Sequence, residues 1–177
     1  MRKFRILLLI LASAACTLGA QAAGPEIGTL MERARDLFDY GRWSDARHEF
    51  LRAKAALTPS DRLLAQEVEF YLAACAVELD SADAEGALRE FDERYPGSVY
   101  ANDVRFALGS FYCSAGNMKK AREAFEKTDY RALSAPRREQ YDIRMGYVEF
   151  GDGNYAKAYG YFDRIGSRSE YVDHARY

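Results

Sequence analysis

Four pairs of residues recur along this chain, and each pair is an alanine followed four residues later by a phenylalanine. Residues four apart lie on one face of a helix, so each pair presents a small side chain and a ring to the same neighbour. The pairs recur at intervals of 41, 34 and 37 residues, and a period of this size is typical of helix–turn–helix solenoids. The spacing therefore predicts an all-α fold. The four pairs are Ala46/Phe50, Ala87/Phe91, Ala121/Phe125 and Ala158/Phe162.

A column of small residues stands on the first helix of each repeat, seven positions before the expected turn. Its members are Ala34, Cys75, Gly109 and Gly146, and the matching turn positions are Gly41, Ala82, Gly116 and Gly153. Glycine suits the left-handed cap that ends a helix, so the second repeat departs from the pattern at its turn. Together with the four Ala/Phe pairs, the small residues are the expected packing positions between the two helices of a repeat.

The third copy is the fullest, and it carries a family resemblance. It reads Leu108-Gly109-x-x-Tyr112, then Gly116, then Ala121-x-x-x-Phe125. This resembles the tetratricopeptide repeat (TPR), whose pattern includes L-G-x₂-Y and A-x₃-F. The resemblance implies a right-handed helical solenoid that binds other proteins. Four repeats are expected at about 27–57, 60–95, 99–130 and 134–166.

The end of the chain repeats an earlier stretch. Tyr171-Val172-Asp173-His174-Ala175-Arg176-Tyr177 echoes Tyr100-Ala101-Asn102-Asp103-Val104-Arg105-Phe106 at an offset of 71 residues. We therefore expect a fifth repeat to begin within 168–177, and the chain to be the N-terminal piece of a longer protein.

Turn and cap residues divide the repeats into helices. Expected helices lie near 27–40, 44–56, 60–79, 83–95, 99–114, 117–127, 135–150 and 154–165. Ser44 is expected to cap the second helix, while Ser134 and Pro136 suit the start of the seventh.

The first 22 residues have the features of a secretory signal peptide. Arg2, Lys3 and Arg5 are followed by an apolar run over 6–15 and by the cleavage signal Ala20-Gln21-Ala22. The run is too short to span a bilayer, and no later segment is apolar enough to do so. The mature chain, 23–177, is then expected to form one TPR-like domain.

An alternative reading of the same region is a lipid anchor. Ser13-Ala14-Ala15-Cys16 looks like a bacterial lipobox, in which Cys16 is acylated, although Ser13 stands where leucine is expected. Ordinary cleavage is the preferred interpretation. Either way the protein is expected to be exported.

The junction between the second and third repeats suggests a compartment. Tyr95-Pro96-Gly97-Ser98-Val99-Tyr100-Ala101 resembles the Y-P-x-S-x-Y-A junction of periplasmic TPR proteins similar to the Tol-Pal system coordinator and the barrel-assembly lipoprotein. This resemblance, over about 26–177, implies a scaffold of the bacterial cell envelope, in the periplasm or on the periplasmic face of the outer membrane. Its partners would be other envelope proteins or peptide segments.

The sequence offers no catalytic or metal-binding pattern, so we expect neither an enzyme nor a cofactor. The two histidines, His48 and His174, lie far apart and outside any Cys or carboxylate cluster at ligand spacing. Asp152-Gly153-Asn154 lacks the remaining ligands of a calcium loop. An exported pair of cysteines can form a disulfide, but Cys75 and Cys113 are expected to be two buried free thiols. Loss of Arg2, Lys3 and Arg5 with the signal leaves a net charge of about −5, which does not favour nucleic-acid binding.

The TPR resemblance also places a partner-binding groove on the first helices of the repeats. The groove residues it implies are Arg35, Asp39, Glu69, Phe106, Ser110, Gln140 and Tyr147. Two rings among polar groups suit recognition of a peptide segment. Alternatively, Phe106 and Tyr147 pack against neighbouring repeats. A second reading of the whole chain is a helical module of an exported enzyme or glycan-uptake protein, with the active part beyond residue 177.

Overall fold

A computed structural model describes residues 26–166, so the signal region, the Cys16 motif and the expected fifth repeat lie outside the described residues. Within this range the chain forms eight α-helices and one short 3₁₀-helix, η1. They are α1 Ile27–Asp39, α2 Trp43–Ala56, α3 Arg62–Glu78, α4 Ala84–Arg94, α5 Ala101–Ser114, α6 Met118–Glu126, η1 Tyr130–Ala132, α7 Ala135–Gly151 and α8 Tyr155–Phe162.

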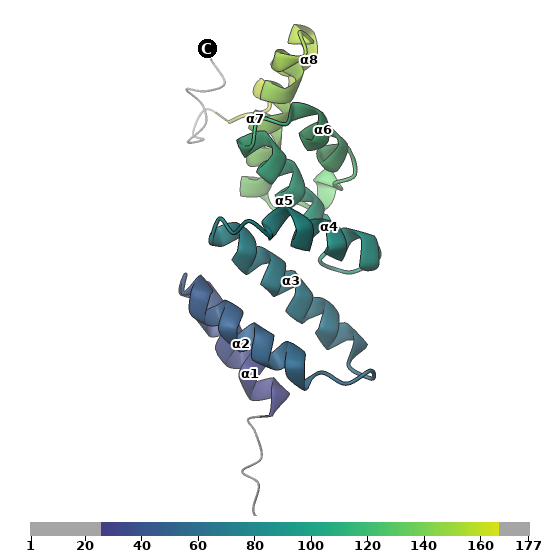
Figure 1. Ribbon diagram of the computed structural model, residues 1–177. Helices are drawn as coiled ribbons and strands as arrows, with labels where there is room; N and C mark the ends of the chain where they lie inside the picture. Colours follow the sequence, from purple (N-terminus) through teal and green to yellow (C-terminus); the bar gives the residue numbers. More distant parts are fainter. Residues whose placement is uncertain (1–25, 167–177) are drawn as a thin grey trace, which may run out of the picture.

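The helices pack in chain order along an elongated stack, with α1 and α2 at one end and α8 at the other (Figure 1). The helices pair as α1/α2, α3/α4, α5/α6 and α7/α8, and each pair makes one helical hairpin. Residues 26–166 contain no strand. The all-α prediction is therefore confirmed. No helix in this part of the chain combines the length and apolar character needed to span a membrane.

The expected packing positions lie mostly in the interior of the stack, although Cys75 packs with buried residues of α1 and α2. Ten of the twelve are buried, and Phe50, Phe91 and Phe125 are among the largest side chains fully removed from solvent. Ala87 and Phe162 are half-buried. At Gly109 and Gly146 the rings of Phe125 and Phe162 approach the backbone so closely that no β-carbon would fit. Each ring thus packs against the first helix at its smallest residue.

The turn inside the second hairpin differs from the prediction. In the other three hairpins a glycine ends the first helix in the left-handed conformation, at Gly41, Gly116 and Gly153 with φ of 70°, 73° and 77°. In the second hairpin this conformation belongs to Asp80, with φ of 49°, and not to Ala82. The assignment of Ala82 was wrong because α3 ends two residues earlier than the repeat register predicts.

Two hydrogen bonds identify Asp80 as the equivalent of the turn glycines. Its N–H donates to the Val77 carbonyl and the Ser81 N–H donates to the Ala76 carbonyl, as Gly116 and the residue after it do at the end of α5. These are the two bonds of a Schellman-type helix end. The linker to α4 is correspondingly longer. The small residue and the alanine that follows therefore remain twelve positions apart in all four hairpins.

The helices begin close to the cap residues expected from the sequence, with one exception. Ser134 is the N-cap of α7 and a proline follows in its first turn. Ser44 does not cap α2, because the left-handed Gly41 reverses the chain early enough for the helix to begin at Trp43, with Arg42 as N-cap. Asn117 caps α6, and its side chain accepts a hydrogen bond from the Lys120 N–H at 3.1 Å.

The hydrophobic core consists of two clusters. The first joins α1, α2 and one side of α3, around Met31, Phe50 and Val68. The second extends from the other side of α3 to α8, and includes Phe91 and Phe125. Both clusters draw residues from α3, so this helix connects them.

Candidate functional site

The first helices of the four hairpins, α1, α3, α5 and α7, define what we call the first-helix face. Two ion pairs link neighbouring helices across it. The Arg35 Nε donates to Glu67 Oε1 at 2.7 Å between α1 and α3, and Arg137 pairs with Asp103 between α7 and α5. Each pair joins residues more than thirty positions apart in the sequence. This face therefore carries ordered polar groups as well as packing contacts.

Aromatic side chains surround the Arg35–Glu67 pair. The Tyr71 ring stacks on Phe50 at 4.8 Å between centroids, and the Tyr100 ring stacks on Phe70 at 4.4 Å. Burial, together with the nearby Glu67 carboxylate, raises the pKa of both tyrosine hydroxyls. Two half-buried tyrosines beside an ion pair form a surface of the kind that contacts peptide backbones and side chains.

At the other end of the first-helix face, α5 and α7 contribute Ser110, Gln140, Arg144 and Tyr147. Ser110, Gln140 and Arg144 are half-buried, while Tyr147 is 43% exposed and meets the edge of the Phe162 ring at 5.5 Å. Arg35 is half-buried and Asp39 is exposed at the end of α1. Six of the seven expected groove residues are thus at least partly accessible to solvent.

Phe106 corrects the expected groove. This ring is only 7% exposed and lies in the larger hydrophobic cluster, 6.0 Å from Phe125 between centroids. The guanidinium of Arg137 lies 5.7 Å above it and covers it from the adjacent helix. Phe106 therefore packs between repeats, as in the alternative reading of the sequence, and is no binding residue.

Glu69 also lies elsewhere than expected. Its carboxylate accepts two hydrogen bonds of 2.9 Å from Arg94 on α4 and lies 3.4 Å from Lys54 on α2. It therefore faces the second helices. Residues two apart on a helix differ by about 200° in direction, so Glu67 occupies the position that had been assigned to Glu69.

Sequence reasoning missed Glu67, Tyr71, Tyr100 and Arg144. Glu67 and Tyr71 are four residues apart, which places them on one face of α3, and that spacing was a usable signal. No comparable signal marks Arg144, because its environment depends on which α5 residues lie opposite.

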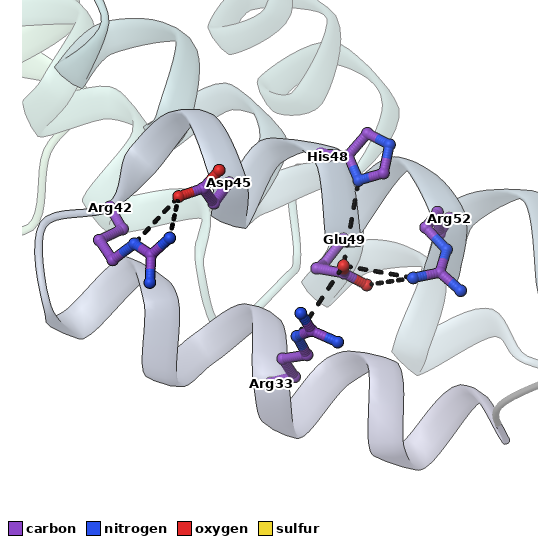
Figure 2. A network of polar contacts seen from close by, with 6 residues as sticks. All are labelled: Arg33, Arg42, Asp45, His48, Glu49 and Arg52. Atoms are coloured by element: carbon purple, nitrogen blue, oxygen red, sulfur yellow. Dashed lines mark hydrogen bonds and ion pairs between the residues drawn. The ribbon is translucent and has the colours of Figure 1, made fainter.

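In the described part of the chain, three carboxylates are buried next to arginines, away from the groove residues. Figure 2 shows Glu49 of α2, which is 5% exposed and accepts a 2.9 Å hydrogen bond from Arg52. Arg33 and His48 lie 3.9 Å from the same carboxylate, and the His48 side chain is 73% exposed. Because Arg33 lies on α1 and Glu49 on α2, this ion pair links the two helices and has a structural role.

The other two buried carboxylates, Asp142 and Glu149, lie on α7. Burial raises the pKa of Asp142, although Tyr130 and Arg164 donate hydrogen bonds to it. Burial also opposes ionisation of Glu149, but hydrogen bonds from Arg122 and Asn154 outweigh it and hold the pKa below its ordinary value. Between residues 26 and 166 no three His, Cys, Asp or Glu side chains are grouped to hold a metal ion.

Two hollows lie between successive second helices. One, of about 280 Å³, is lined by α4, α5 and α6, and the other, of about 190 Å³, by α2, α3 and α4. Acidic and basic side chains line both hollows, and most of them pair with each other. Arg105, for example, pairs with Asp92 at 2.7 Å. These hollows therefore offer little net charge to select a ligand.

A family model described as tetratricopeptide repeat matches residues 67–98, which cover most of α3, all of α4 and the turn that follows. This match supports a TPR protein. The eight helices accordingly form a TPR-like helical repeat solenoid. No curated protein and no solved structure matches the chain.

TPR repeats generally mediate protein–protein interaction, and TPR domains are typically non-catalytic. The matched segment is the hairpin whose turn lacks glycine. In TPR arrays the first helices line the concave surface used for binding. The first-helix face is therefore the candidate protein-binding site of this TPR-like solenoid.

Proposed function

We propose that this TPR protein is a non-enzymatic scaffold of the bacterial cell envelope that binds protein segments on its first-helix face. The observation that carries the proposal is the arrangement of Tyr71, Tyr100 and Tyr147 among charged groups along α3, α5 and α7. Partly exposed aromatic anchors with a polar surround are typical of protein-recognition surfaces.

The envelope location rests on the N-terminal sequence and on the Tyr95–Ala101 junction, with its resemblance to periplasmic TPR proteins of the Tol-Pal coordinator and barrel-assembly lipoprotein types. Fractionation of cells that express the full chain tests it, and export should depend on residues 1–22. Replacing Cys16 by alanine separates the two N-terminal readings. Loss of membrane association would favour the lipid anchor, and unchanged processing would favour cleavage before Ala23.

Site-specific photocrosslinking tests the binding face. A photoreactive phenylalanine analogue at Tyr147 keeps an aromatic ring on the first-helix face, and the same analogue at Lys119 probes the exposed surface of α6. In envelope extracts we expect protein adducts from position 147 and few from position 119. Adducts from position 119 alone, or from neither position, would contradict the proposed face.

A further inference from the structure

The contact between α5 and α7 repeats itself two turns along the helices. Asp103 on α5 pairs with Arg137 on α7. Seven residues further on stand Ser110 and Arg144, and seven residues are about two turns, so they occupy the same helix faces. The ring of Phe106 lies below Arg137, and Cys113, seven residues after it, lies within the electrostatic influence of Arg144. The register of the two helices is therefore kept, but the acidic residue of the first pair is replaced by a serine in the second.

Arg144 is consequently a half-buried cation that no carboxylate of the described residues 26–166 neutralises. Within residues 26–166 it makes no ion pair or hydrogen bond. The five other half-buried arginines of this range all pair with a carboxylate: Arg35, Arg47, Arg105, Arg122 and Arg137. A guanidinium keeps its charge at any physiological pH, and partial burial strengthens its attraction to an anion.

Ser110 provides a second observation at the same place. Its Oγ is buried, and within the described chain no hydrogen-bond partner reaches it. Buried hydroxyls are normally hydrogen-bonded, so an unsatisfied one calls for an explanation. Because a serine stands here and not an aspartate, the Arg144 guanidinium keeps donors that a carboxylate from outside the chain can accept.

We propose that the α5–α7 part of the first-helix face binds a partner peptide through an acidic side chain that pairs with Arg144. The Tyr147 ring, three residues after Arg144 on the same helix, packs against the neighbouring peptide residue. This inference rests on the proposed function, because it names the chemistry of the bound segment.

The attraction between Arg144 and an acidic peptide residue is local, because the charge of the molecule as a whole does not contribute to it. The formal net charge is −2 for the full chain and about −5 once Arg2, Lys3 and Arg5 leave with the signal, so an acidic peptide gains no long-range steering. Recognition at Arg144 should therefore depend on the position of one acidic residue in the peptide more than on the total charge of the peptide.

A peptide-display selection against the full chain provides the probe. Peptides selected from a random library are synthesised in pairs that differ only by an acidic residue or its amide. Their dissociation constants are measured with the wild type, with Arg144→Gln and with Arg144→Lys. Arg62→Gln, which removes an exposed arginine at the start of α3, is the matched control.

We expect Asp or Glu to be enriched in the selected peptides. Arg144→Gln should weaken the acidic peptide about tenfold, the loss of one charge-assisted hydrogen bond, and leave its amide twin unchanged. Arg144→Lys should retain part of the affinity, and Arg62→Gln all of it. Circular dichroism of each variant checks that the helices remain folded.

Two results would overturn the inference and are distinguishable. If peptides crosslink to position 147 but Arg144→Gln weakens acid and amide twins equally, the acidic anchor is wrong while the binding face stands. If selected peptides crosslink only to position 119, the proposed function fails with it.

Discussion

The ring of Phe125 occupies the space that a side chain on Gly109 would need. An ideal β-carbon on this glycine would lie 2.5 Å from two ring atoms of Phe125, which is itself fully buried. Gly146 and Phe162 repeat the relationship on α7 and α8, where the nearest ring atom would lie 2.2 Å away. The absence of a side chain on the first helix thus sets the distance between the two helices of a hairpin.

Gly109→Ala should therefore destabilise the protein although alanine favours helix formation. Overpacking against Phe125 is expected to cost about 1–3 kcal/mol, measured by urea unfolding. The matched control is Gly86→Ala at an exposed position of α4, where a β-carbon would meet nothing within 4 Å. This change should stabilise the protein by about 0.5–1 kcal/mol. Equal effects at the two glycines would rule out the close contact as the cause.

Introducing a glycine at one turn and removing a glycine at another should change stability in opposite directions. Asp80 holds a left-handed conformation that costs a non-glycine residue about 1–2 kcal/mol, so Asp80→Gly should raise the melting temperature slightly. Gly116→Ala places a non-glycine residue in the left-handed conformation at this turn. The same conformational cost should then lower the melting temperature by several degrees. If Ala82→Gly stabilised the protein instead of Asp80→Gly, the left-handed position would have been misplaced.

Glu149 should make stability depend on pH. Its pKa is lowered in the folded state, so its ionised form adds stability above the ordinary pKa of a glutamate, and this contribution is lost as the pH falls through the folded value. Glu149→Gln should cost about 1–3 kcal/mol at neutral pH, because Arg122 loses a charged partner. The difference from wild type should shrink below about pH 4, which denaturant titrations at several pH values measure.

Glu32→Gln, an exposed change on α1, serves as the control for Glu149→Gln and should leave stability unchanged across the same pH range. A penalty for Glu149→Gln that persisted undiminished in acid would assign the effect to packing and not to charge.

Cys75 should be chemically inert while the protein is folded. Both cysteines in the described range are free, and burial raises the pKa of Cys75 to about 11. Its thiol therefore stays protonated at neutral pH and is shielded from reagents. Iodoacetamide labelling followed by peptide mass spectrometry should modify Cys113, which is half-buried, well before Cys75. Labelling of Cys75 at the same rate with and without urea would contradict its burial.

The packing between helices could be predicted from the sequence because it depends on residue size. Ala34 and Gly109 stand the same number of positions before Phe50 and Phe125, and all four residues are buried at the contacts between helices. Such a pattern is visible in the sequence because a ring and a small residue are needed at fixed helical spacing.

The end of α3 and the groove residues could be predicted only in part, because each depends on contacts with neighbouring residues that the repeat pattern does not fix. A turn without glycine is ambiguous, and here Asp80 takes the left-handed position two residues before the expected one. Phe106 has the right position for the groove, but whether its ring is open or covered depends on Arg137 of the next repeat. An unpaired Arg144 is likewise a property of α5 and α7 together.

The two hydrophobic clusters that meet at α3 give the array a mechanical consequence. A force that pulls its ends apart would act on two blocks in series, α1–α2 with one side of α3 and the remainder of the stack. The first block has fewer buried side chains, so it should rupture at lower load and let the chain lengthen in a discrete step. The α5–α7 surface would still be folded at that moment, so a partner held there would stay attached while the N-terminal hairpin absorbs the strain.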